Sequence, residues 1–153
     1  MQTQAELAMI VKDAYENSDF SGMFPVMEEE YEHISFWVTE VLRGKKRAME
    51  YYSSKAAHIR SDPTAAVTGR LVRILEAPDR VRPHGVYRGG LRMLEDRSFL
   101  HRNDAGKIAV LMKQYIDYEK TDVYMLAIPT ASENGLLKQV LIANPDFYKW
   151  EEL

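Results

Sequence analysis

The sequence predicts an α+β fold, in which helices come first and a mainly antiparallel sheet follows. Residues 4–16 and 45–60 carry apolar side chains three or four positions apart, the spacing that lines one face of a helix. Four later segments are rich in β-branched and aromatic residues, which favour strands. A run of helices followed by a run of strands is typical of α+β proteins.

The first helix has a recognisable start. Thr3 and Glu6 form a capping-box pattern, in which the hydroxyl and the carboxylate satisfy N–H groups that the first turn leaves free. Polar residues 17–19 end this helix, and a brief second helix is expected over residues 20–27. The apolar face of the first helix consists of Leu7, Ile10, Val11, Ala14 and Tyr15.

A strand and a third helix are expected next. Residues 31–39 are rich in β-branched and aromatic side chains and predict a strand. Pro63 ends the third helix, because proline disfavours helical geometry in the residue before it. This helix follows Gly44, and its apolar face consists of Ala48, Tyr52, Ala56 and Ile59.

The second half of the chain supplies the rest of the sheet. Asn134–Gly135 ends a turn of hairpin type between the last two strands. Residues 76–106 separate the first strand from the second, and a connection of this length is uncommon in compact domains and often functional. The strand over 31–39 is expected in the same sheet. The four strand candidates are residues 65–75, 107–118, 123–130 and 136–143.

Residues 19–52 combine several features in a fixed order: Asp19 and Gly22, the acidic run Glu28–Glu30, the strand from Tyr31 to Thr39, and the turn Gly44–Lys45. In this order they resemble the opening of the nuclear-transport-factor-2-like superfamily, which includes ketosteroid isomerases and polyketide cyclases. The fold alone does not specify a ligand, because the superfamily hosts unrelated activities.

The resemblance covers residues 3–75 and 107–145. It implies a single domain over residues 1–153, shaped as a cone in which a curved, mainly antiparallel sheet packs against three N-terminal helices and wraps a pocket. Residues 76–106 are then an arginine-rich insertion, since simple members of the superfamily connect these strands by a short turn.

The resemblance also implies which side chains line the pocket. Alternate residues of a strand share a face, and in the superfamily one face of this strand points into the cone, toward the first helix. The expected ligand-pocket residues are therefore Tyr31, His33, Ser35, Trp37, Val11 and Tyr15.

Steroid isomerase chemistry is not supported. The position of the isomerase carboxylate falls on Ser35, whose hydroxyl is not ionised at neutral pH. The isomerase tyrosine falls on Val11, and residues 123–132 contain no Asp or Glu that could help to bind an oxyanion.

His33 and Tyr31 are the candidate catalytic residues. Imidazole titrates near neutral pH and suits acid–base chemistry, and scytalone-dehydratase-like members of the superfamily use histidine, aspartate and tyrosines in this cone. The alternative is that His33 is a hydrogen-bonded residue of a partly buried strand and that Trp37 belongs to the core. The sequence identifies no carboxylate partner for His33.

The insertion concentrates arginine. It holds six arginines and five acidic residues, and Arg82, His84 and Arg88 lie together without an acid between them. These three residues are a possible anion contact through forked donors. The alternative is that the arginines pair with acids such as residues 28–30. No metal or cofactor is expected, because the four histidines are scattered without a ligand motif.

Composition limits the function classes. The chain has 153 residues and no cysteine, which excludes disulfides and thiolate chemistry. A net charge of −3 without a basic stripe argues against nucleic-acid binding. No apolar run reaches the roughly 18 residues needed to cross a bilayer, and the first residues lack a signal-peptide pattern. We expect a cytoplasmic protein that does not bind membranes.

The sequence favours a small-molecule-binding pocket protein with an undefined ligand. One alternative is a lyase or isomerase that acts on a small hydrophobic or cyclic substrate, and another is a non-catalytic dimerisation or interaction module. We also expect a homodimer, which in the superfamily commonly forms through the outer face of the sheet. Candidate contacts are Lys113, Tyr115 and Tyr124, with Val140 or Leu141.

Overall fold

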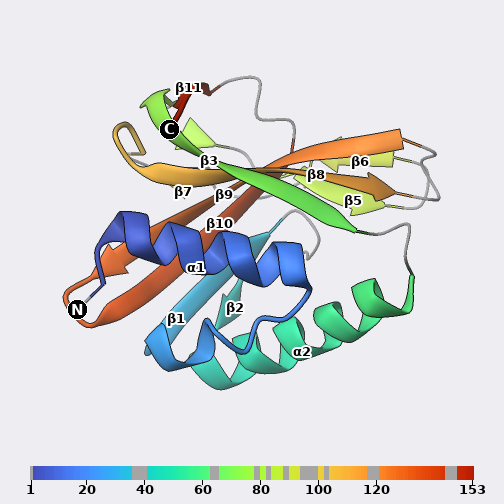
Figure 1. Cartoon of the computed structure of the whole chain (residues 1–153), viewed down its shortest axis with the longest axis horizontal. Coiled ribbons are helices and arrows are strands. Elements are labelled where there is room, and N and C mark those ends of the chain that lie inside the picture. The colour runs from blue at the N-terminus through green and yellow to red at the C-terminus, as the bar shows by residue number, and fades with distance from the viewer. Residues whose placement is uncertain are drawn as a thin grey trace.

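The computed structural model of the chain has the predicted α+β architecture (Figure 1). One seven-stranded sheet forms the centre, and helices α1 (Gln4–Asn17) and α2 (Lys45–Ser61) lie on the same side of it (Figure 1). None of the helices within the described residues is long and apolar enough to cross a membrane. The structure describes residues 2–35, 41–62, 66–77, 80–81, 84–87, 90–93, 100–101, 104–116, 121–143 and 148–153.

Both long helices are confirmed, while the short one between them is smaller than expected. The predicted capping box is present, since the Thr3 hydroxyl accepts from the Glu6 N–H at 3.1 Å and the Glu6 carboxylate accepts from the Thr3 N–H at 3.2 Å. The expected second helix is only the 3-10 helix η1 (Phe24–Val26), because the first strand already begins at Met27. Gly44 precedes α2 with a φ of 96°, a value that favours glycine.

The central sheet contains all four strands expected in the second half, in the order β11-β3-β8-β9-β10-β1-β2. The pairing is antiparallel except between β1 and β10, which are parallel. The short strand β2 and the edge strand β11 were not predicted. The bounds are β1 Met27–Ser35, β2 Leu42–Arg43, β3 Val67–Glu76, β8 Ile108–Ile116, β9 Thr121–Ser132, β10 Gly135–Ala143 and β11 Lys149–Glu152.

The predicted strand over 31–39 is confirmed as far as Ser35 and shares its sheet with β8, as expected. It starts earlier than predicted, because the acidic run Glu28–Glu30 is itself part of β1. Residues 36–40 lie outside the described part of the chain.

Apolar side chains cover both faces of the central sheet. The inner face packs on α1 and α2, in a cluster that includes Leu7, Tyr15, Phe20, Tyr52, Met112 and Met125. The outer face carries a second buried cluster, which includes Ile34, Ile74, Leu111, Ile128, Val140 and Tyr148. Leu141 belongs to the inner cluster, so of the two alternatives for the outer face only Val140 lies there.

The insertion contains short strands rather than one long loop. β4 (Arg80–Val81) pairs with β7 (Leu100–His101), and β5 (His84–Tyr87) pairs with β6 (Gly90–Met93). Arg82 and Arg88 lie outside the described residues, and only the backbone of His84 is described. The anion contact through these three residues therefore stays a prediction.

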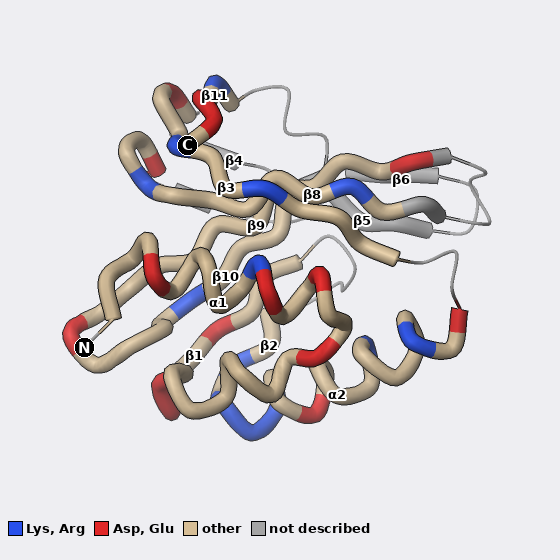
Figure 2. The backbone as a smooth tube through the Cα atoms, viewed as in Figure 1, with Lys and Arg blue, Asp and Glu red and all other residues tan. Residues whose placement is uncertain are grey.

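Charged residues of both signs are interspersed along the described backbone (Figure 2). The strand edges pair some of them: Arg70 lies 3.1 Å from Glu152 across β3 and β11, and Glu32 lies 3.8 Å from Arg43 and 3.9 Å from Lys138. These pairs are exposed or half-buried, so each contributes little to stability.

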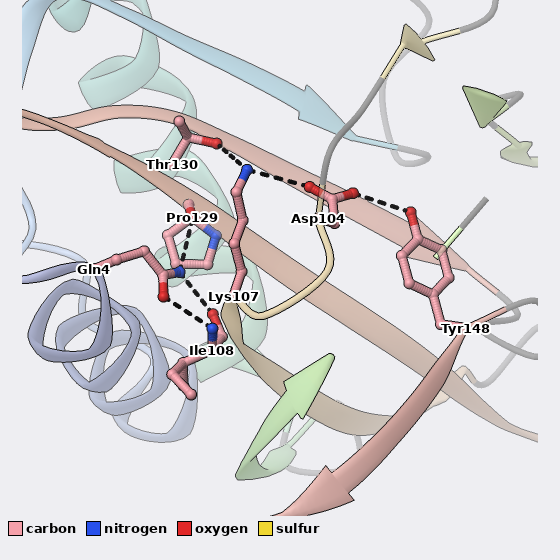
Figure 3. A network of polar contacts seen from close by, with 7 residues as sticks. All are labelled: Gln4, Asp104, Lys107, Ile108, Pro129, Thr130 and Tyr148. Atoms are coloured by element: carbon pink, nitrogen blue, oxygen red, sulfur yellow. Dashed lines mark hydrogen bonds and ion pairs between the residues drawn. The ribbon is translucent and has the colours of Figure 1, made fainter. Parts of the chain in front are cut away.

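The side chain of Gln4 bridges the sheet where Pro129 interrupts it (Figure 3). The β8–β9 pairing ends at Val110 opposite Ala127, so Ile108 and Pro129 face each other two positions further on. Proline has no N–H to donate to a neighbouring strand. The Gln4 amide instead donates to the carbonyls of Ile108 at 2.7 Å and Pro129 at 2.9 Å, and accepts from the Ile108 N–H at 2.8 Å.

A second group of contacts fastens the turn between the insertion and β8 (Figure 3). The buried Asp104 carboxylate accepts from the Lys107 ammonium at 3.2 Å and from the Tyr148 hydroxyl at 3.4 Å. Lys107 also donates to the Thr130 hydroxyl at 3.1 Å. These contacts join the end of the insertion, strand β9 and the residue before β11.

Replacing Gln4 by alanine should lower the free energy of unfolding by about 1–3 kcal/mol, because partly buried backbone groups lose their partners. In a Pro129→Ala background the same replacement should cost less, since residue 129 then has its own N–H for the neighbouring strand. Urea unfolding of the parent, both single variants and the double variant measures this coupling.

Gln2→Ala is the control for this comparison, because Gln2 precedes the helix. An equal cost of the Gln4 replacement in both backgrounds would show that Gln4 does not compensate for the proline.

Candidate functional site

The structure brings most of the expected pocket residues together between β1 and the helices. Tyr31 and His33 are completely buried, and the next alternate residue, Ser35, is also buried. Val11 and Tyr15 of α1 belong to the inner cluster that contains Tyr31. Trp37, the remaining residue of the set, lies outside the described residues.

Tyr52 of α2 is the centre of a buried polar network. Its hydroxyl lies 2.7 Å from the Tyr31 hydroxyl and 2.8 Å from Nδ1 of His33. It also lies 3.1 Å from Oε1 of Gln139 on β10. Tyr31 and His33 are therefore linked through Tyr52, and neither Tyr52 nor Gln139 was among the predicted site residues.

Gln139 extends the network to the first helix. Its Nε2 donates to the Tyr15 hydroxyl at 2.8 Å, and its Oε1 lies 3.5 Å from the Tyr31 hydroxyl. Gln139 is completely buried. Side chains from α1, β1, α2 and β10 thus converge on one amide and one hydroxyl, which fixes how these four elements pack.

The network has one open end, at His33. Its Nε2 is buried and makes no hydrogen bond with any residue that the structure describes. The imidazole packs against the Tyr51 ring, with ring centres 5.1 Å apart. Tyr51 and Lys55 are half-buried and one helical turn apart on α2, and the Lys55 ammonium lies 6.0 Å from the ring centres of Tyr51 and Tyr15.

Burial sets the protonation states of the site. It lowers the pKa of His33 to about 3, with a smaller contribution from the charge of Lys55, so the imidazole is neutral at neutral pH. Burial lowers the pKa of Lys55 to about 7. Burial also raises the pKa of Tyr51 to about 12, although a hydrogen bond with Ser35 lowers it in part. The pKa values of Tyr15, Tyr31 and Tyr52 are raised by burial as well.

These states define what the site can do. Neutral His33 offers one nitrogen that is not engaged by Tyr52, and the phenols stay protonated. No Asp or Glu hydrogen-bonds to His33 in the described structure, and the same residues contain no group of three or more His, Asp or Glu side chains that could hold a metal ion. The arrangement suits hydrogen bonding to a ligand more directly than proton transfer at neutral pH.

Sequence reasoning missed four residues of this site. Tyr52 was assigned only to the apolar face of its helix, and Tyr51 and Lys55 to no role. Gln139 carries the one local signal, an amide within the largely apolar segment 136–143, but this signal does not tell which face of the strand the amide points to.

No protein-family model matches the sequence, and no curated protein is significantly similar to it. Solved structures share the fold. An NTF2-like protein of unknown function from Cytophaga hutchinsonii aligns with a TM-score of 0.56 and 10% identity, covering 92% of this chain and 99% of that chain.

Two further structures aligned with a TM-score of 0.52. A putative SnoaL-like polyketide cyclase from Jannaschia sp. CCS1 is 9% identical, and the alignment covers 92% of this chain and 85% of that chain. TerC, co-crystallised with polyporic acid, is 10% identical, with 94% and 92% covered. At these identities the similarity establishes the fold alone. It confirms the cone-shaped nuclear-transport-factor-2-like fold that the resemblance implied.

The neutral His33 should make stability depend on pH. Its pKa is about 3 in the folded protein against an ordinary 6.5, so protonation favours the unfolded chain. The stability that neutral His33 permits is complete above pH 6.5 and is lost as the pH falls toward about 3. Relative to His33→Gln, the parent should lose up to about 1.4 kcal/mol per pH unit in this range, measured by urea unfolding.

Lys55 should affect stability in a separate and higher pH range, between its ordinary pKa of 10.5 and its pKa of about 7 in the folded protein. Stability should fall there as the pH falls, and Lys55→Met should remove that slope while keeping most of the acidic window, which arises mainly from the burial of His33. Superimposable acidic slopes for the parent and His33→Gln would contradict burial of a neutral imidazole.

Proposed function

We propose that the protein binds a small molecule at the open end of the buried network, beside His33, Tyr51 and Lys55. The observation that carries this proposal is the buried Nε2 of His33, which has no partner among the described residues. A buried polar atom without a hydrogen bond costs about 1–3 kcal/mol. A ligand that supplies the missing partner recovers this cost on binding.

The surroundings of His33 suggest the kind of molecule. The rings of Tyr51 and Tyr52 lie 5.1 Å and 5.0 Å from the imidazole, which favours a flat cyclic ligand. Lys55 provides a cation at the same end of the cluster. A small aromatic anion combines both requirements. The fold is compatible with such a role, since TerC has it and was co-crystallised with polyporic acid.

An alternative is a lyase or isomerase that acts on a small hydrophobic or cyclic molecule at the same place. The lone nitrogen of His33 favours it, because such a nitrogen can accept a proton from a substrate. The low pKa of His33 restricts this base to substrates with an unusually acidic proton. Tyr31 would act through Tyr52, because its hydroxyl is buried against Tyr52.

Binding of 2-naphthoate, an aromatic carboxylate, tests the proposal by isothermal titration calorimetry. Binding should weaken about tenfold or more in Lys55→Met, which removes the charge-assisted contact, while Lys113→Met on the other side of the sheet should bind like the parent. Absence of binding to the parent, or equal binding by both variants, would count against the site.

The affinity for 2-naphthoate should also fall as the pH rises through about 7, the pKa of Lys55, because the deprotonated amine no longer attracts the carboxylate. Among the site residues beside it, His33 stays neutral between about pH 6 and about pH 9, and the pKa values of Tyr15 and Tyr51 are raised. Lys55→Met should show no such pH dependence.

We also propose that the chain forms a homodimer, or serves as an interaction module, through one end of the outer sheet face. Tyr124 is 52% exposed there and pairs with Lys113 in the β8–β9 register. Both line a shallow hollow of about 230 Å³ together with Thr68 and Arg70. The side chain of Tyr115 is not described. The cytoplasmic location expected from the sequence also stays a prediction.

Sedimentation velocity tests the dimer. The parent should sediment as a dimer at micromolar concentration, consistent with a contact above about 1,000 Å². Tyr124→Glu should shift it to the monomer, because a charge is placed in the contact. Met9→Glu, at an exposed position of α1, should remain dimeric. A monomeric parent would reject the proposal.

A further inference from the structure

We infer that Tyr52 and Gln139 are positioning residues that hold the proton of His33 on Nδ1 and leave a lone pair on Nε2, so that the site selects ligands with a hydroxyl donor. The inference rests on the proposed function and adds the ligand chemistry that the site accepts. Neither Tyr52 nor Gln139 needs to touch the ligand, since both act through His33.

The hydrogen-bond capacity of Tyr52 decides the direction of the network. A tyrosine hydroxyl donates one hydrogen bond and accepts two. Its three neighbours are the Tyr31 hydroxyl at 2.7 Å, Nδ1 of His33 at 2.8 Å and Oε1 of Gln139 at 3.1 Å. An amide oxygen can only accept, so the proton of Tyr52 goes to Gln139. Tyr52 then accepts from Tyr31 and from Nδ1–H of His33.

The reverse assignment leaves a bond unmade. If Tyr52 donated to Nδ1 of His33, the oxygen of Gln139 would keep only the Tyr31 hydroxyl, 3.5 Å away. That hydroxyl has one proton, and the Tyr52 oxygen is much closer, at 2.7 Å. A completely buried amide oxygen would lose its partner, which costs more than the bond itself is worth. With the amide oxygen directed at Tyr52, the first assignment satisfies every one of these contacts at once.

The orientation of the Gln139 amide therefore sets what His33 presents. Its Nε2 faces the Tyr15 hydroxyl at 2.8 Å, which directs its oxygen toward Tyr52. With the amide turned around, Gln139 would donate to Tyr52, Tyr52 would donate to Nδ1, and His33 would present an N–H instead. One amide on β10 thus decides whether the site accepts or donates a hydrogen bond.

A lone pair on Nε2 prefers a ligand with an O–H group. Because burial keeps the imidazole neutral, this nitrogen accepts a hydrogen bond without becoming charged. The half-buried Lys55 ammonium favours a negative charge elsewhere on the same molecule. The chemical class that meets both conditions is a hydroxylated aromatic or enolic carboxylate. Its methyl ether has the same ring and charge but leaves Nε2 without a donor.

Nitrogen-15 NMR of the histidine side chains tests the tautomer directly in the parent protein. We expect the signals of His33 to show a protonated Nδ1 and an unprotonated Nε2. The measurement can tell these apart because protonated and unprotonated ring nitrogens differ strongly in chemical shift. Gln139→Met keeps the length of the side chain but removes the amide, and should abolish this preference. A parent with the proton on Nε2 would overturn the inference. Tyr52→Phe is a second variant, in which Nδ1–H loses its acceptor.

A matched pair of ligands tests the selectivity. The parent should bind 6-hydroxy-2-naphthoate about tenfold or more tightly than 6-methoxy-2-naphthoate, since only the first has a donor for Nε2. The ratio should approach one in Gln139→Met. Equal binding of both by the parent would overturn the inference while leaving the proposed function intact. Failure of both, and of 2-naphthoate, would reject the proposed function, and the NMR result would still decide the tautomer.

Discussion

The packing of the helices on the sheet depends on one buried hydroxyl, that of Tyr52. It lies within hydrogen-bonding distance of side chains from two strands, and through Gln139 it is linked to the first helix. A hydroxyl buried without a partner costs about 1–3 kcal/mol, more than the roughly 0.5–1.5 kcal/mol that a formed hydrogen bond contributes. Any slip of α2 along β1, or of β1 along β10, would break several of these bonds together. The network therefore selects one arrangement more strongly than apolar contacts alone would.

Aromatic packing also fixes how the helices lie on the sheet. Phe20, from the segment after α1, stacks on the Tyr52 ring with centres 4.7 Å apart and meets the Tyr15 ring edge-on at 4.9 Å. The three rings bury large apolar areas, while the two tyrosine hydroxyls point to Gln139. All three rings thus belong to the inner core, and the hydroxyls of the two tyrosines also belong to the polar network. Apolar and polar packing support the same placement of the helices.

Local patterns predicted the elements well because helical and strand periodicity are properties of neighbouring residues. They located α1, α2 and the main strands, and they placed Tyr31 and His33 on one face. They could not predict Gln139. Strict alternation from the inward Leu136 would put Lys138 inside and Gln139 outside, but a bulge between Leu136 and Lys138 shifts the register. That shift turns the lysine out and the amide in, and only the folded sheet reveals it.

The polar clusters around Gln4 and around Tyr52 differ in one respect that bears on function. Around Gln4 the amide oxygen and nitrogen both bond to the backbone of the sheet, so this cluster is closed and serves the fold. Around Tyr52 the chain of hydrogen bonds continues to His33 and ends there, at a buried nitrogen without a partner in the described structure. A cluster that served packing alone would gain stability from an apolar ring at this position, because the cost of the unpaired nitrogen would disappear. The proposed ligand would supply the partner that the described residues do not, and this is the reason to assign the site to His33 rather than to the network as a whole.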